Sequence, residues 1–251
     1  MEPKAAVSPR PLARIAGGLY LINIVGGFFA IGYVPAAIVV AGDAVGTAHN
    51  LQAHEMLYRM GLLAHIAILC TNVGLAVIFY DLFKVVSRRI ALLVVFFTLV
   101  GTAVEGAGLT SQFAPLSLLQ GGNYAGLTVQ QVQALAYLPI DLLGISYVVS
   151  SVFFAFYGLA IGYLVFRSGF LPRLIGALLA IGALSYLAYS VTSILSPEFA
   201  SHLVPYIQLP SLIGEGSFCL WLLVIGVNAQ RWNDRAGTST PASSESVPSP
   251  T

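Results

Sequence analysis

Six long apolar stretches dominate this chain, and each is long enough to cross a lipid bilayer. They cover approximately residues 15–41, 60–83, 90–112, 142–166, 171–195 and 210–229. A helix needs roughly 20 mainly apolar residues to span the hydrocarbon core, whereas the strands of a membrane barrel alternate in polarity over about ten. Because a bilayer leaves no water for unpaired backbone groups, these stretches are expected to be helices. The sequence therefore predicts an all-α polytopic membrane protein, a bundle of six transmembrane helices.

The composition excludes the main soluble classes. Of the 251 residues, 57% are hydrophobic and only 8% are charged, whereas soluble domains carry about 25% charged residues. The net charge of +1 leaves no basic surplus for binding nucleic acid. The chain has no phosphate-binding glycine loop, so no nucleotide or other cofactor is expected. The expected partner is the lipid bilayer.

The basic residues predict the orientation of the six spans. All Lys and Arg residues except Arg59 fall on one side of this topology. They are Lys4, Arg10 and Arg14 before the first span, Lys84, Arg88 and Arg89 in the second connection, Arg167 and Arg173 in the fourth, and Arg231 and Arg235 after the last span. Because cytoplasmic loops are enriched in Lys and Arg, both termini are expected in the cytoplasm, with the chain in the plasma membrane. Residues 1–14 then form a cytoplasmic segment, and the polar residues 231–251 a disordered cytoplasmic tail.

Two outward connections contain local helix signals. The segment 42–59 is expected to begin as a loop and to become helical from about Leu51, with Glu55 and Arg59 spaced for an ion pair. Thr128 and Gln131 match a capping box, which predicts a short surface helix before the fourth span. The connection 196–209 contains two prolines and is expected to be a loop.

Small residues spaced four apart indicate where helices approach closely. Gly158 and Gly162 form a GxxxG pattern, and Gly176 with Ala180 gives a second pair of this kind. The favoured interpretation is packing within one chain. A homo-oligomer formed through Gly158 and Gly162 is the alternative.

Several segments along the chain carry a resemblance to a known protein family. They are residues 13–20 entering the first span, the loop residues Gly42, Asp43, Thr47, Asn50, Glu55 and Arg59, the segment 162–173 with its Arg-Ser-Gly-Phe-Leu-Pro-Arg turn, and residues 220–222. In these segments the chain resembles the bacterial multi-span membrane proteins grouped as domain-of-unknown-function family 4386, over roughly residues 10–230. The resemblance implies a multi-span protein. It supplies no settled activity, so no functional residue is carried over from it.

Ionisable groups inside the spans are the candidates for function, because each costs about 2.5–3.5 kcal/mol at a helix centre on insertion scales. They are His65, Glu105 and Glu215, with Asp141 at the mouth of the fourth span. Glu105 lies about seven residues, or roughly 10 Å, from the outer end of its span, and the others share this outer half. His54, His65 and Asn72 are spaced to lie near one helix face. We therefore predict an outward-opening polar pocket lined by His65, Asn72, Glu105 and Glu215, with Asp141 and His54 at its rim.

Three interpretations of these polar residues stay open: hydrogen bonds that only fix the bundle, a pocket for a small or lipid-like molecule, and a metal site. His54-Glu55 lacks the second histidine of the His-Glu-x-x-His motif, so no metal ligand is assigned. Three functions also stay open. The first is binding or transport of a small or lipid-like molecule, the second a structural or interaction subunit, and the third a membrane-embedded lipid-modifying enzyme with His65 as base. The sequence favours the first and leaves enzymatic activity undecided.

Overall fold

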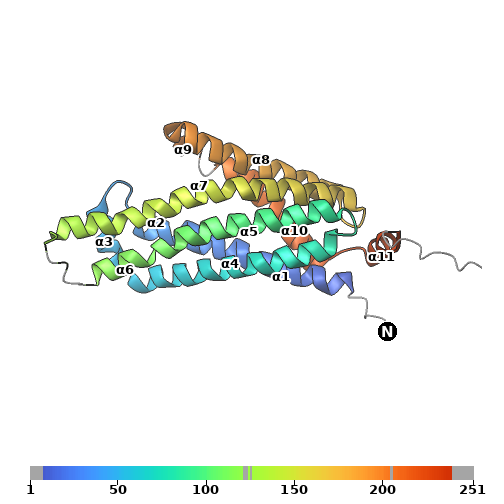
Figure 1. Cartoon of the computed structure of the whole chain (residues 1–251), viewed down its shortest axis with the longest axis horizontal. Helices are drawn as coiled ribbons and strands as arrows, with labels where there is room; N and C mark the ends of the chain where they lie inside the picture. Colours follow the sequence, from blue (N-terminus) through green and yellow to red (C-terminus); the bar gives the residue numbers. More distant parts are fainter. Residues whose placement is uncertain (1–7, 121–123, 125, 204–205, 239–251) are drawn as a thin grey trace, which may run out of the picture.

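The protein is a bundle of long helices. The structure, a computed structural model, describes residues 8–120, 124, 126–203 and 206–238, and among these residues there is no strand. Six helical segments are long and apolar enough to cross a membrane. Figure 1 shows the long helices lying side by side, with α9 projecting away from the bundle at the end opposite α11.

The helical elements follow one another with short connections. They are α1 (Pro9–Gly27), the π-helical segment η1 (Phe28–Tyr33), α2 (Val34–Ile38), α3 (Ala44–Ala53), α4 (Glu55–Phe83), α5 (Arg88–Ser111), α6 (Phe113–Leu119), α7 (Val129–Ser168), α8 (Arg173–Leu195), α9 (Pro197–Leu203), the 3₁₀ segment η2 (Tyr206–Gln208), α10 (Leu209–Val224) and α11 (Ala229–Thr238). The predicted loop at 196–209 therefore contains α9 and η2.

The long helices form a closed ring. Each of α1, α4, α5, α7, α8 and α10 packs against the next along the chain, and α10 packs back on α1. Short connections place consecutive helices antiparallel to one another. The arrangement brings the second half of α5 alongside the first half of α4, which is important for the site below.

The first outward connection is more helical than predicted. Helix α3 begins at Ala44 rather than near Leu51, because Asp43 caps it by accepting a 2.9 Å hydrogen bond from the Gly46 amide. The expected ion pair is present: Arg59 Nε donates to Glu55 Oε1 at 2.7 Å.

The predicted surface helix before the fourth span is not a separate element. The capping box of Thr128 and Gln131 is confirmed, but the helix that it starts is α7, which continues for 40 residues to Ser168. Pro139 lies inside this helix and is buried. Its carbonyl accepts hydrogen bonds from the side chains of Ser111, the last residue of α5, and Gln112, which follows it. Helix α7 thus continues through a residue type that often kinks or breaks helices, at the point where side chains at the end of α5 contact it.

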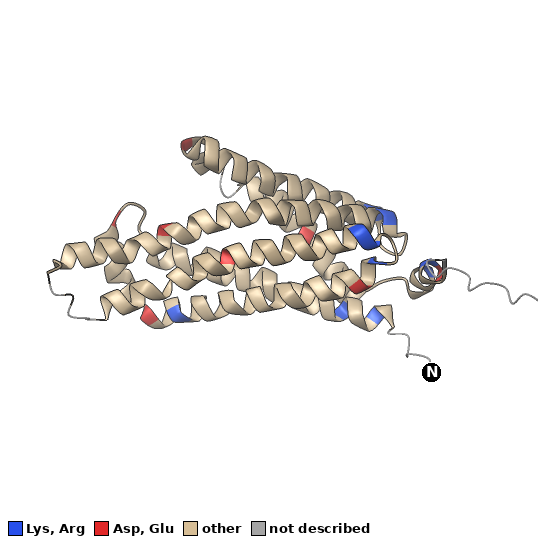
Figure 2. Cartoon of the chain, in the orientation of Figure 1, with Lys and Arg blue, Asp and Glu red and all other residues tan. Residues whose placement is uncertain are grey.

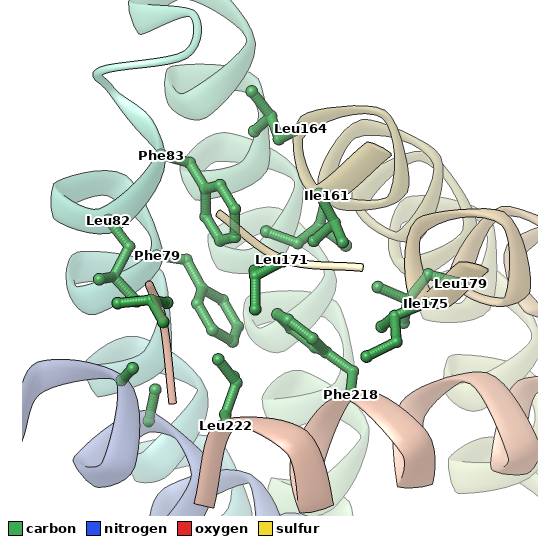
Figure 3. Close-up of a cluster of buried hydrophobic side chains, with 14 of the residues drawn as sticks. Phe79, Leu82, Phe83, Ile161, Leu164, Leu171, Ile175, Leu179, Phe218 and Leu222 are labelled. Carbon is green, nitrogen blue, oxygen red and sulfur yellow. The ribbon is translucent and has the colours of Figure 1, made fainter. Parts of the chain in front are cut away.

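Aromatic and aliphatic side chains fill the interior of the helix bundle in one of its two halves. Figure 3 shows Phe79 and Phe83 of α4 and Phe218 of α10 gathered with side chains of α7 and the 171–179 region. The rings of Phe79 and Phe218 have centroids 5.5 Å apart, and all three phenylalanines are fully buried. We call this group, with Ile161, Leu164 and Leu222, the phenylalanine core. It closes the bundle near the end where α4 finishes and α5 begins.

The glycine pairs pack helices within the chain. A Cβ on Gly162 would lie 2.9 Å from the Gly176 carbonyl oxygen, and one on Gly158 would lie 2.8 Å from Ala183 Cβ. Both contacts are between α7 and α8, so α8 of the same chain covers this face.

Positive charge gathers at the same end of the bundle as the phenylalanine core. Figure 2 shows the Lys and Arg residues at the end that holds the start of α1 and helix α11, and Arg59 is the exception among the described residues. The tail predicted from residue 231 is partly ordered instead. Trp232 Nε1 donates to the Leu82 carbonyl at 2.9 Å, and Arg231 Nη1 donates to the Gly169 carbonyl at 3.0 Å. Residues 239–251 of that prediction lie outside the described residues.

Candidate functional site

A buried histidine–glutamate pair joins α4 to α5. His65 Nε2 lies 2.9 Å from Glu105 Oε1, and both residues are only 3% exposed. His65 shares the buried face of α4 with Gly61, Leu62 and Ile68, as a 3.6-residue period requires. The proton between the two atoms can belong to the ring or to the carboxyl group. The structure thus pairs two residues that the sequence singled out separately.

The pair lies in the wall of a cavity of about 190 Å³. The walls of the cavity are formed by η1 and α2, the first half of α4, the second half of α5, and α7. Its polar lining residues are Tyr58, His65, Glu105, Gln112 and Tyr147, and most of the remaining wall is apolar, including Val34, Leu62, Leu109 and Leu143. An engineered apolar cavity of about 150 Å³ takes up benzene. The space is therefore sufficient for a small organic molecule or for one end of a longer one.

The cavity opens sideways between η1 and α7. Ile31 of η1 and Gly144 of α7 both line the cavity, and both are exposed. A Cβ built on Gly144 meets no atom within 4 Å, so space is open beside it. Since both segments belong to helices of membrane-spanning length, this opening faces the side of the bundle rather than one of its ends.

The irregular end of the first span forms one wall. The π-helical segment η1 ends two residues before Pro35, which cannot donate the usual backbone hydrogen bond to Ile31. Ala30, Ile31, Val34 and Pro35 all line the cavity. Such π-helical turns interrupt an otherwise regular helix and occur frequently at functional sites.

A second group of buried hydrogen bonds, formed by Tyr58 and Gln112, links the helices that surround the cavity. The Tyr58 hydroxyl lies 2.9 Å from the side-chain oxygen of Gln112 and 3.0 Å from its backbone carbonyl oxygen, and its single hydrogen can be donated to either. The Gln112 amide in turn donates to the Pro139 carbonyl, which links α4, α5 and α7. Neither residue is among those that the sequence singled out. Their spacing was a usable signal, because Tyr58 lies seven residues before His65 and Gln112 seven residues after Glu105, on the same helix faces.

Glu215 lies outside this cavity, in a group of its own on α10. Ser211 Oγ donates to Glu215 Oε1 at 3.0 Å, and the side chains of Tyr20 and Tyr186 also interact with the carboxyl group. We call these four residues the Glu215 cluster. Tyrosines are common in apolar membrane spans, so the sequence gives no signal that connects Tyr20 and Tyr186 with Glu215.

The other predicted site residues are not in the cavity wall. Asn72 is half-buried on α4 and lies two turns beyond His65, toward the phenylalanine core. Asp141 and His54 are exposed, and neither lines the cavity. The structure therefore brings His65 and Glu105 together and places the other four elsewhere. No group of three or more His, Cys, Asp or Glu side chains suited to a metal ion occurs in the part of the chain that the structure describes.

Six helices of membrane-spanning length, arranged around a buried polar pair, define the chain as a multi-pass helical membrane protein. It belongs to the family described as Domain of unknown function (DUF4386), which matches residues 15–226. No curated protein and no solved structure matches the chain. The family description carries no activity, so the function has to be argued from the cavity.

Proposed function

We propose that the protein binds a small amphipathic or lipid-like molecule in this cavity, with the polar group of the ligand at His65 and Glu105. The observation that carries the proposal is a buried His–Glu pair in the wall of a cavity that opens sideways. A polar pair is expensive to place among apolar helices. Its position beside open space gives it a use beyond joining α4 to α5.

The chemistry of the walls limits the ligand class. The His–Glu pair and the Tyr147 hydroxyl offer both hydrogen-bond donors and acceptors. Among the described residues that line the cavity there is no Lys or Arg, so nothing there would compensate a phosphate or carboxylate group. A hydroxyl, amide or amine head on a short apolar chain fits these walls. A longer chain would extend through the opening beside Gly144.

The space around the pair argues against a purely structural role. In a subunit whose polar residues only hold helices together, we expect buried polar groups to be satisfied by each other. Here open space lies directly beside the pair, because His65 and Glu105 both line the cavity.

We also propose that both termini face the cytoplasm and that the cavity lies in the outer half of the plasma membrane. The support is the gathering of Lys and Arg at the end of the bundle that holds α11 (Figure 2), as in cytoplasmic loops generally. The phenylalanine core then closes the cytoplasmic half. Binding needs no change in that core, whereas transport would require it to open, so binding is the function that this arrangement favours.

Blocking the opening tests the proposal. The probe is a medium-chain alcohol that carries a photoreactive diazirine, added to the protein in lipid nanodiscs, and labelled peptides are mapped by mass spectrometry. We expect adducts on the cavity-facing parts of α4 and α5. The Gly144→Phe variant should lower this labelling by about tenfold or more, equivalent to a loss of at least about 1.4 kcal/mol in binding, because the new ring occupies the open space at the entrance.

A matched glycine provides the control. Gly18 on α1 lies away from the cavity, and a Cβ built there also meets no atom within 4 Å. The Gly18→Phe variant should therefore label as the unmodified protein does. Equal labelling of the cavity in both variants, or adducts spread evenly over lipid-facing residues such as Leu63, would contradict the proposal.

A further inference from the structure

The cavity has a second polar group in its wall besides the His65–Glu105 pair. Tyr58 and Gln112 also line the cavity, and both are buried. Tyr58 lies seven residues before His65 on α4, and Gln112 lies seven residues after Glu105 on α5. Seven residues advance a helix by about 10 Å. The wall therefore presents two separate polar groups to a molecule that occupies the cavity.

Apolar side chains separate the two polar groups. On each of the two helices, a leucine that lines the cavity lies between the polar residues. In chain order, the residues are Tyr58, Leu62 and His65 on α4, and Glu105, Leu109 and Gln112 on α5. Because the helices are antiparallel, Tyr58 meets Gln112 and His65 meets Glu105, with the leucines in the layer between. A molecule that lies along the cavity meets polar, apolar and again polar surface.

The opening of the cavity lies between the two polar groups. On α7, Pro139 contacts Gln112, and Leu143 lies 3.5 Å from a Cβ built on Gly108 of α5. Gly108 comes between Glu105 and Gln112 in the chain, and Gly144 at the opening directly follows Leu143. A molecule that enters beside Gly144 therefore arrives at the apolar layer, from which its two ends can reach opposite polar groups.

The hydrogen bonds at the second polar group leave Tyr58 able to accept one more. Its hydroxyl hydrogen is directed to one of the two oxygens of Gln112, and the Gln112 amide donates to the Pro139 carbonyl. A tyrosine hydroxyl accepts as well as donates, and no residue that the structure describes donates to the Tyr58 oxygen. A ligand group that carries a hydrogen, such as a hydroxyl, can therefore donate to Tyr58 without breaking its bond to Gln112.

We infer that the cavity selects a bipolar ligand, a short apolar chain with a polar group at each end. One polar group is held by His65 and Glu105, and the other donates a hydrogen bond to Tyr58. This inference rests on the proposed function and narrows its ligand class. It assigns Tyr58 a role in ligand specificity in addition to its link between α4 and the end of α5.

The separation of the two polar groups sets the length of the ligand. An extended chain advances about 1.2 Å per bond, so a terminal diol with about six carbons has its oxygens roughly 8 Å apart. A hydrogen bond at each end then covers the remaining distance to the protein groups. A molecule of this size is compatible with a cavity of about 190 Å³, since about 150 Å³ accommodates benzene.

Two matched photoreactive probes test the inference on the protein in lipid nanodiscs. One is a six-carbon alcohol with a diazirine near the middle of its chain, and the other is the corresponding terminal diol. Labelling is measured on peptides of α5, away from the substituted residue. Tyr58→Phe removes the hydroxyl and retains the ring. It should lower labelling by the diol about three- to tenfold, as expected for the loss of one hydrogen bond, and change labelling by the alcohol less than about twofold.

A second tyrosine provides the matched control. Tyr163→Phe alters an exposed tyrosine of α7 that does not line the cavity, and this variant should label as the unmodified protein does with both probes. Equal effects of Tyr58→Phe on the two probes, or no effect on the diol, would overturn the inference, while labelling by the alcohol would still support the cavity function. If neither probe labels the cavity of the unmodified protein, the proposed function is wrong and this inference falls with it.

Discussion

Replacing Glu105 with alanine is expected to lower the free energy of unfolding by about 1–3 kcal/mol, the cost of leaving a buried polar partner unsatisfied. The partner is His65, which is 3% exposed and would retain a ring nitrogen facing an empty space. The measurement is reversible unfolding in mixed micelles. Glu55→Ala is the matched control, since it removes an exposed ion pair from the first turn of α4. Exposed pairs contribute little to stability, so this variant should unfold almost as the unmodified protein does.

A double-mutant cycle isolates the interaction itself. Combining His65→Ala with Glu105→Ala should cost less than the sum of the two single variants, because either change alone already breaks the pair. Interhelical hydrogen bonds in membranes contribute about 1–2 kcal/mol in model peptides and often less in whole proteins. Strictly additive effects would show that the two side chains do not interact and that the cavity wall is wrongly described.

Replacing Gly17 with alanine is expected to destabilise the protein by about 1–3 kcal/mol, the usual cost of overpacking. A Cβ at this position would lie 2.5 Å from the Leu223 amide nitrogen and 2.7 Å from its Cα. Both atoms belong to the backbone of α10, so the contact cannot be relieved by rotating a side chain. The helices α1 and α10, which close the ring, would have to move apart.

The next residue provides the opposite expectation. A Cβ at Gly18 meets no atom within 4 Å, and alanine in a helix interior is favoured over glycine by roughly 0.5–1 kcal/mol. Gly18→Ala should therefore be neutral or slightly stabilising in the same unfolding assay. Equal effects at Gly17 and Gly18 would contradict the close approach of α1 to α10.

The long spans were predictable because their signal is local. Twenty or more apolar residues in a row leave few alternatives to a membrane helix, and the structure has six such helices. Two of the errors occurred where helices distant in sequence contact each other. Helix α7 continues through Pro139, where Gln112 contacts it, and α11 is held by the contact of Trp232 with Leu82. Neither contact can be inferred from the residues flanking it.

The sequence predicts how deep each candidate residue lies in its span, but it does not predict which neighbouring helix that residue faces. Counting residues from the ends of the spans placed His65, Glu105 and Glu215 in one layer, which made their convergence plausible. Which side of a helix faces which neighbour depends on packing around the whole ring. The structure pairs His65 with Glu105, whereas Glu215 of α10 faces Tyr20 and Tyr186 instead.

Cryo-electron microscopy of the protein in lipid nanodiscs tests the cavity most directly. We predict non-protein density between η1, α4, α5 and α7, with its polar end beside Glu105 and His65 and its remainder directed toward Gly144. A cavity that has collapsed, with Leu62, Leu109 and Tyr147 in contact and no density beside the His–Glu pair, would contradict the account.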